Sequence, residues 1–221
     1  MIQLVEGVLT VGALLVCVIP HEIAHGYVAW RLGDPTAKRA GRLSLNPLRH
    51  LDPIGSLLFP AALLLLRRLV GFPIVFGWAK PVPINPNYFR NPWKGMLWVA
   101  LAGPATNFLL AGVVAAVGRG LVAVGFTNQW VLFFLAMVVL IGLVLGLFNL
   151  LPVPPLDGSR ILAYFLPPRW RWQLTQLEQV GVVIIMVLIL LGVLELVFRG
   201  ASRAWLALVG WKWAILIGFL L

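Results

Sequence analysis

The residues best suited to chemistry form a His-Glu-x-x-His pattern that runs from His21 to His25. Residues four apart in a helix lie on one face, one turn apart, so both imidazoles can reach one metal ion. Glu22 follows the first histidine and lies beside such an ion, where its carboxylate can take a proton from a metal-bound water without ligating the metal. The spacing therefore predicts a hydrolytic metal site.

The stretch that carries this pattern, residues 4–30, is long and apolar enough to cross a membrane as a helix. Polar groups at membrane depth cost about 2.5–3.5 kcal/mol each on insertion scales, so they need partners or a metal. A plainer alternative is that His21 and His25 bond to neighbouring helices or anchor at the membrane interface. The glutamate between them and their apolar surroundings favour the metal.

A catalytic zinc site usually has three protein ligands and one open position, so a third ligand is expected elsewhere. Asp157 is a candidate because it lies in the Pro-rich stretch 152–158, where a helix is predicted to start. It can also cap that helix. Cys17, one turn before His21, is an alternative ligand or a buried core residue. Four other acidic residues lie near predicted ends or loops, where a solvated carboxylate is expected: Glu6, Asp34, Glu178 and Glu195.

The composition points to a membrane protein with several spans. The chain has 221 residues, of which 61% are apolar and 11% charged, and its mean hydropathy is +0.98. These values exclude disordered, collagenous, coiled-coil and disulfide-stapled classes, and the chain has one cysteine. The net charge of +10 raises nucleic acid as a partner, but no basic helix or basic-aromatic platform stands free of the apolar segments. The basic loops are expected to face the lipid bilayer, and the ten tryptophans to form interfacial belts.

We predict an all-α polytopic membrane protein with about five to six transmembrane helices and short membrane-associated β or extended segments. Residues 31–52 are predicted to form two or three short strands or turns, and 71–86 an extended segment. The chain is expected to be one domain, 1–221, with a catalytic core at about 4–166 and C-terminal membrane helices at about 178–221. Besides 4–30, the candidate spans are 92–117, 129–150, 180–198 and, as the last candidate, 205–221. The apolar stretch 54–66 is too short for an upright span.

The basic residues set the expected orientation. Residues 31–49 hold five Lys and Arg, whereas none precedes the first helix. Since Lys and Arg collect on the cytoplasmic side, the first helix is predicted to run inward. The metal site is then expected toward the cytoplasmic face of the cell membrane.

Three segments resemble the site-2 protease family of intramembrane zinc metalloproteases: the His21–His25 pattern, Gly103-Pro104 with Asn107, and the ten residues 149–158. The resemblance implies one zinc ion held by His21, His25 and Asp157, with Glu22 as general base. It also suggests Asn149 as a donor to the developing oxyanion. Residues 77–83 and 46–55 extend the similarity. One departure is that no loop between residues 31 and 92 could hold the PDZ domain found in many relatives.

The resemblance further implies regulated cleavage of peptide bonds in or near the membrane segment of a single-span protein. Such a segment must unwind first, and it could add as a β-strand to residues 71–86. A metal or proton transporter and an inactive membrane-span-binding scaffold are the alternatives; the transporter predicts polar clusters in two halves of the chain, and none is visible. The oligomeric state stays open.

Five further residues have plainer explanations. His50 and Asp52 could form a second metal site, but turn and capping duties are expected more strongly. Asn107 could bond to a ligating histidine or only join two helices. Gly103 and Gly112 are expected to allow close helix packing.

Overall fold

The structure is a computed structural model that describes residues 2–50, 52 and 80–218. All regular structure in these residues is helical, with no strand among them, which confirms the predicted all-α class. The helices, in chain order, are α1 (Ile2–Arg31), α2 (Thr36–Arg39), η1 (Pro47–Arg49), η3 (Pro86–Tyr88), α4 (Pro92–Ala123), α5 (Gln129–Asn149), α6 (Asp157–Phe165), α7 (Pro168–Gln176), η4 (Leu177–Val180), α8 (Gly181–Leu190), α9 (Val193–Val209) and α10 (Trp211–Leu216).

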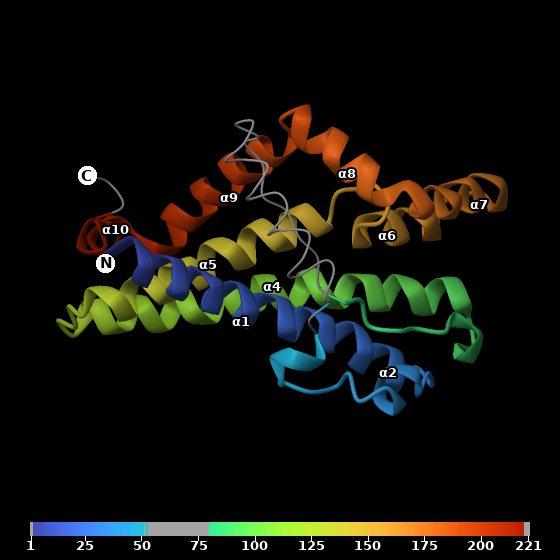
Figure 1. The fold of residues 1–221 in the computed structure, drawn as a ribbon, viewed down its shortest axis with the longest axis horizontal. Helices are drawn as coiled ribbons and strands as arrows, with labels where there is room; N and C mark the ends of the chain where they lie inside the picture. The colour runs from blue at the N-terminus through green and yellow to red at the C-terminus, as the bar shows by residue number, and fades with distance from the viewer. Residues whose placement is uncertain (1, 51, 53–79, 219–221) are drawn as a thin grey trace.

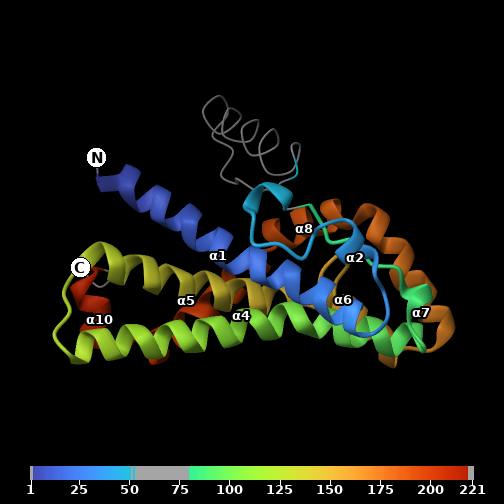
Figure 2. The same ribbon diagram turned by 90° about the horizontal axis from the view of Figure 1, so that it is seen from below.

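Three long helices, α1, α4 and α5, pack against one another and form the centre of the molecule (Figures 1 and 2). Two of them begin where asparagine side chains bind the first free backbone N–H groups. Asn91 caps α4 and is followed by Pro92, and Asn128 caps α5. The predicted helices at 4–30, 92–117 and 129–150 are therefore confirmed. Short helix α6 lies beside α4, close to the chain interruption that follows α5.

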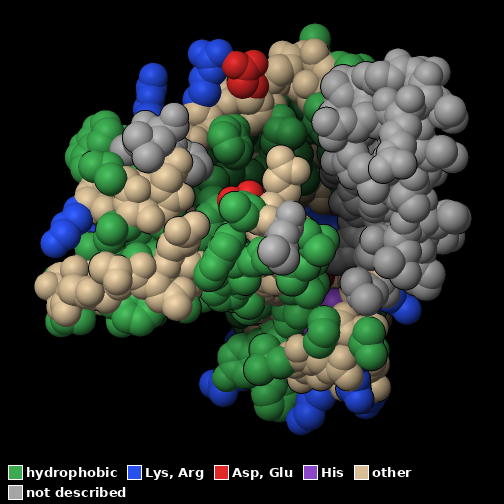
Figure 3. All heavy atoms as spheres, turned by 60° about the vertical axis from the view of Figure 1, so that its left-hand side comes forward, with side chains coloured by type: hydrophobic (Ala, Val, Ile, Leu, Met, Phe, Trp, Pro, Cys, Tyr) green, Lys and Arg blue, Asp and Glu red, His purple; other side chains and the backbone are tan. Residues whose placement is uncertain are grey.

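Four of the described helical stretches are long and apolar enough to cross a membrane: 2–31, 92–123, 129–149 and 168–190. One face of the molecule is largely hydrophobic, with most of its visible Lys and Arg side chains near the rim (Figure 3). Both observations fit a protein embedded in a membrane. The short apolar stretch 54–66 lies outside the described residues.

The C-terminal third differs from the prediction. The apolar run 180–198 is divided at Gly192, whose φ of +78° ends α8 and turns the chain into α9 (Figure 1). A second glycine with a positive φ, Gly210 at +81°, separates α9 from α10 within the predicted span 205–221. Glycine adopts this conformation without steric cost, so it can end a helix inside apolar sequence. Neither predicted span is one continuous helix in the described residues.

Helices α9 and α10 pack on the core through two buried tryptophans. The indole N–H of Trp205 donates to the Ala136 carbonyl at 2.8 Å, and that of Trp213 donates to Leu132 at 3.1 Å. Both side chains are 1% exposed. The expectation that all ten tryptophans lie in interfacial belts is wrong for these two, because each finds a backbone acceptor inside the protein. The boundary between a core at 4–166 and a C-terminal region stays a prediction.

The segment after α1 forms turns and short helices rather than strands. Asp34 in this segment is completely buried, so the expectation of a solvated carboxylate is wrong. Its oxygens accept hydrogen bonds from the Thr36 N–H at 2.9 Å, the Thr36 hydroxyl, and the Asn85 N–H at 2.7 Å. Asp34 thus joins the end of α1 to residues 80–86, which run without helix or strand as far as η3. We call residues 80–86 the strap.

Candidate metal centre

Side chains from α1 and α6 converge inside the protein. The Nε2 atoms of His21 and His25 lie 3.0 Å apart, and each lies 3.3 Å from Oδ2 of Asp157. All three residues are buried, with exposed fractions of 5–6%. Asp157 Oδ2 accepts no well-directed hydrogen bond. The two imidazoles and the carboxylate therefore aim three ligand-type atoms at one small volume.

The spacing of these atoms fits a zinc ion. Zinc binds histidine nitrogen and carboxylate oxygen at about 2.0–2.2 Å in tetrahedral geometry, which places ligand atoms roughly 3.3–3.6 Å apart. The three observed separations between ligand-type atoms, 3.0, 3.3 and 3.3 Å, are close to this ligand-to-ligand distance. The set supplies three corners of a tetrahedron and leaves the fourth open, as catalytic zinc sites do.

One face of α4 supports both imidazoles. Val99, Gly103 and Asn107 are spaced four residues apart and so form one stripe of the helix. The Val99 carbonyl contacts His25 Nδ1 at 2.7 Å, and the Asn107 amide contacts His21 Nδ1 at 3.1 Å. Between them, a Cβ atom on Gly103 would lie 2.5 Å from ring atoms of both histidines. The predicted packing role of Gly103 is thus specific, whereas a Cβ on Gly112 would meet nothing within 4 Å.

Asp157 is the first residue of α6, and Leu156 is the residue that precedes the helix, without a side-chain cap. The capping alternative for Asp157 is therefore wrong. Gly158 fits against the Leu150 and Leu151 carbonyls, where a Cβ would lie 2.3 Å from each oxygen. Asp157 lies between two candidate spans. Burial acts to raise its pKa, but its interactions with the two imidazoles outweigh burial and lower the pKa below the ordinary value. It is thus a carboxylate, the form that ligates metals.

Glu22 is held by the strap. Its carboxylate accepts a hydrogen bond from the Val82 N–H at 3.1 Å. The strap is anchored on both sides of this contact, because the buried Arg42 guanidinium donates to the Lys80 and Pro81 carbonyls while Asp34 binds the Asn85 N–H. The backbone thus fixes the position of this carboxylate next to the histidine that precedes it.

Other predicted residues have hydrogen-bond partners of their own outside the ligand cluster. The Asn149 amide donates to the Leu145 carbonyl of its own helix at 3.0 Å. Cys17 donates from Sγ to the Val138 carbonyl at 3.4 Å and does not belong to the ligand group, so the alternative of a thiolate ligand finds no support. His50 Nε2 contacts the Ser44 carbonyl at 2.7 Å, as expected for a turn residue. Within the described residues, His50 and Asp52 join no group that could hold a metal.

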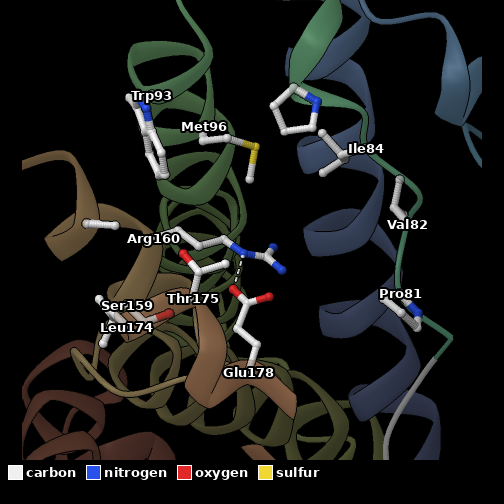
Figure 4. Close-up of a pocket in the computed structure, with 12 residues that line it drawn as sticks. Pro81, Val82, Ile84, Trp93, Met96, Ser159, Arg160, Leu174, Thr175 and Glu178 are labelled. Carbon is white, nitrogen blue, oxygen red and sulfur yellow. Dashed lines mark hydrogen bonds and ion pairs between the residues drawn. The ribbon is translucent and has the colours of Figure 1, made fainter. Parts of the chain in front are cut away.

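A groove of about 430 Å³ opens beside the cluster. Figure 4 shows Val82 and Ile84 of the strap on one side, Trp93 and Met96 of α4 on the other, and Arg160 between them. Arg160 Nε lies 3.4 Å from a Glu178 oxygen, which links α6 to η4. The groove adjoins the site at two points, since Val82 binds Glu22 and Ser159 in its wall follows Asp157 by two residues.

Comparisons with known proteins agree with this site. Residues 120–193 match the model of Peptidase family M50. The chain is 41% identical over 182 residues to "Putative zinc metalloprotease YwhC" of Bacillus subtilis, which covers 79% of this chain and 77% of that protein. It is 33% identical over 184 residues to "Putative zinc metalloprotease Rip2" of Mycolicibacterium smegmatis, covering 83% and 67%, and 34% identical to Rip2 of Mycobacterium tuberculosis over the same shares. No solved structure matches the chain.

The apolar helices, the buried His and Asp cluster and these relatives define a zinc metalloprotease embedded in a membrane. The chain belongs to Peptidase family M50, which confirms the resemblance to site-2 proteases. Sequence reasoning missed the Val99 carbonyl and the Val82 N–H at the site. Every residue carries these backbone groups, so no residue type signals them.

Proposed function

We propose that this protein is an intramembrane endopeptidase in which His21, His25 and Asp157 hold the zinc ion and Glu22 is the general base. One observation carries the proposal: three ligand-type atoms lie within 3.3 Å of one another at a buried point between helices long enough to span a membrane. Charged or strongly polar groups in such surroundings are costly unless a partner or a metal compensates them. A transporter or an inactive scaffold has no observation of its own in its favour.

When bound, zinc supplies an acidified water and polarises the scissile carbonyl. Glu22 takes the proton of the attacking water and later delivers it to the leaving amine. The Val82 N–H holds one oxygen of this carboxylate, so the other is available for the proton. Because Val82 also lines the groove, a bound peptide and the general base share one positioning element.

Asn149 is proposed to donate a hydrogen bond to the developing oxyanion. Its amide rests on the Leu145 carbonyl and must exchange this acceptor for the substrate oxygen. The Leu145 carbonyl can still accept the backbone N–H of Asn149 within the helix after the side chain leaves, because Asn149 is the last residue of α5. A donor of this kind contributes on the order of a hundred- to a thousandfold in turnover.

The proposed substrate is the membrane segment of a single-span protein, unwound around the bond to be cut. A helical segment cannot offer its carbonyls, because they are bonded within the helix. The groove is lined mostly by apolar side chains, as binding of an extended apolar peptide requires. The five basic residues between Arg31 and Arg49 follow the motif helix, which supports placing the site toward the cytoplasm.

The test is co-expression with a tagged single-span reporter, comparing the protein with its Glu22→Gln variant. We expect the variant to keep zinc, since Glu22 is no ligand, and to lose cleavage. Mass spectrometry of the fragments locates the cut relative to the membrane segment. Equal cleavage by both proteins, or a purified wild-type protein without zinc, would overturn the proposal.

A further inference from the structure

Asn107 of α4 is a completely buried polar residue that the proposed mechanism does not use. The Nδ2 end of its side-chain amide lies 3.1 Å from His21 Nδ1, on the ring edge opposite the proposed metal position. The oxygen of this amide, Oδ1, has no partner among the described residues. A buried amide of this kind needs a reason, because an unmet polar atom costs about 1–3 kcal/mol.

Both histidines need a hydrogen-bond acceptor beside Nδ1 if they bind a metal through Nε2. An imidazole that binds a metal through Nε2 carries its hydrogen on Nδ1 and must donate it. His25 meets this demand with the Val99 carbonyl at 2.7 Å. His21 faces only the Asn107 amide at the equivalent position, eight residues further along the same stripe of α4.

The orientation of the amide decides between two roles for His21. If Nδ2 faces the ring, it donates to a bare Nδ1, the hydrogen then sits on Nε2, and the ring cannot ligate. If Oδ1 faces the ring, it accepts the Nδ1 hydrogen and leaves Nε2 bare. The two ends of an amide have nearly the same shape, and hydrogen bonding alone distinguishes them. Either orientation leaves one end of the amide without a partner in the described structure, so counting hydrogen bonds does not distinguish the two orientations. The need of His21 for an acceptor at Nδ1 does distinguish them, because only then is Nε2 free for the metal.

We propose that Asn107 is a positioning residue whose Oδ1 accepts the Nδ1 hydrogen of His21 and holds its Nε2 toward the zinc ion. This rests on the proposed ligand set. In this assignment α4 alone orients both histidine ligands, with Val99 and Asn107 as acceptors. Gly103 between them leaves room for the two rings. The side chain joins two helices only as a consequence of this role.

The test measures zinc affinity by chelator competition on the full-length purified protein. Asn107→Leu keeps the volume and removes the acceptor, and we expect a loss of about 10- to 100-fold. Asn107→Asp keeps acceptors and removes the donor, and we expect affinity within threefold of wild type or tighter. Cys17→Ala is the matched control: it changes a buried side chain of α1 one turn from His21 without touching either ring, and we expect no change.

Cobalt substitution gives a second readout, because visible absorption reports the ligand geometry. The Asp variant should keep the wild-type bands, whereas the Leu variant should change them. Wild-type affinity in a folded Leu variant would overturn the inference, and so would a loss of tenfold or more in the Asp variant. If the Leu variant does not fold, the Asp variant decides alone. A wild-type protein without zinc would instead overturn the proposed function together with the inference.

Discussion

Two buried aspartates, Asp34 and Asp157, show how the same side chain can serve the fold or the chemistry. Both are nearly inaccessible, with exposed fractions of 0% and 6%. Asp34 accepts hydrogen bonds from two backbone N–H groups and one hydroxyl, so its charge is satisfied by the chain. Asp157 instead directs Oδ2 at two imidazole nitrogens and receives no well-directed bond there. The difference in partners, rather than burial, marks the carboxylate that is available to a metal.

The contrast extends to the neighbours of each residue. Asp34 and Arg42 bind backbone atoms of the strap and thereby fix its position. The histidines beside Asp157 are held from behind by α4 and leave their Nε2 atoms facing one another. The Asp34 carboxylate is thus satisfied by the chain, whereas the candidate site keeps unpaired capacity at its centre.

The largest expected effect comes from exchanging the two aspartates for alanine in turn. Asp157→Ala removes a proposed ligand, and we expect zinc affinity to fall by more than the roughly 10- to 100-fold caused by losing an outer partner. Peptidase activity should be undetectable. Asp34→Ala should keep zinc. Metal analysis of both purified variants checks the comparison, which fails if Asp34→Ala loses zinc and Asp157→Ala does not.

A second large effect is expected for Asn149→Ala. The side chain is proposed to act on the substrate oxygen and not on zinc, so turnover should fall about a hundred- to a thousandfold with zinc content unchanged. Single-turnover cleavage of a peptide reporter measures the rate. Unchanged turnover would remove Asn149 from the mechanism and leave its hydrogen bond to Leu145 as its role.

Gly103→Ala tests how closely α4 holds the rings. The added Cβ would lie 2.5 Å from atoms of His21 and His25, so the rings must move. A displacement of about 1 Å can cost roughly a hundredfold in rate. We expect a loss of that order in cleavage and weaker zinc binding. Gly112→Ala in the same helix is the control, since nothing lies within 4 Å, and it should behave as wild type.

A smaller effect, on the stability of the fold, is expected from the loss of the Asp34 carboxylate. Asp34→Ala leaves the Thr36 and Asn85 N–H groups without their acceptor, which should lower the free energy of unfolding by about 1–3 kcal/mol. Thermal unfolding in detergent measures the change. A variant as stable as wild type would show that water or a rearranged strap replaces the carboxylate.

The last effect is expected at Trp205, on stability alone. Trp205→Phe keeps an aromatic ring, removes the indole N–H that binds the Ala136 carbonyl and leaves part of a buried site unfilled, so stability should fall by about 1–3 kcal/mol. Zinc affinity and cleavage should not change, because α9 packs mainly on α5, α4, α8 and α10 rather than on α1 and α6, which carry the proposed ligands. The same unfolding assay provides the measurement, and altered zinc affinity would contradict the expectation.

Sequence reasoning was strongest where residue type and spacing carry the information. The His21–His25 spacing places both rings on one face, and Asp157 stands out as an acidic residue in a Pro-rich interruption. Helices α1, α4 and α5 are long apolar runs with clear starts. The convergence of Asp157 with the histidines needed the fold, since 132 residues separate it from His25.

Other features could not be predicted, for physical reasons. The burial of Asp34 depends on the Asn85 N–H, 51 residues away, and a backbone donor has no sequence signature. Gly192 divides an apolar run, but a single glycine hardly changes the mean hydropathy of that run, so the break could not be predicted from it. Trp205 is buried because α9 returns across α5, which a local pattern does not encode.

The strap has a consequence for how substrates can be told apart. Prolines at 81, 83 and 86 have no N–H, and the N–H groups of Lys80, Val82 and Asn85 are already bound within the protein. Ile84 alone keeps an N–H without a partner among the described residues. A peptide lying along this edge would therefore find almost no donors to pair with. Main-chain pairing with the strap would then rest on the strap's carbonyl acceptors, so the fit of the peptide's side chains would carry more of the recognition.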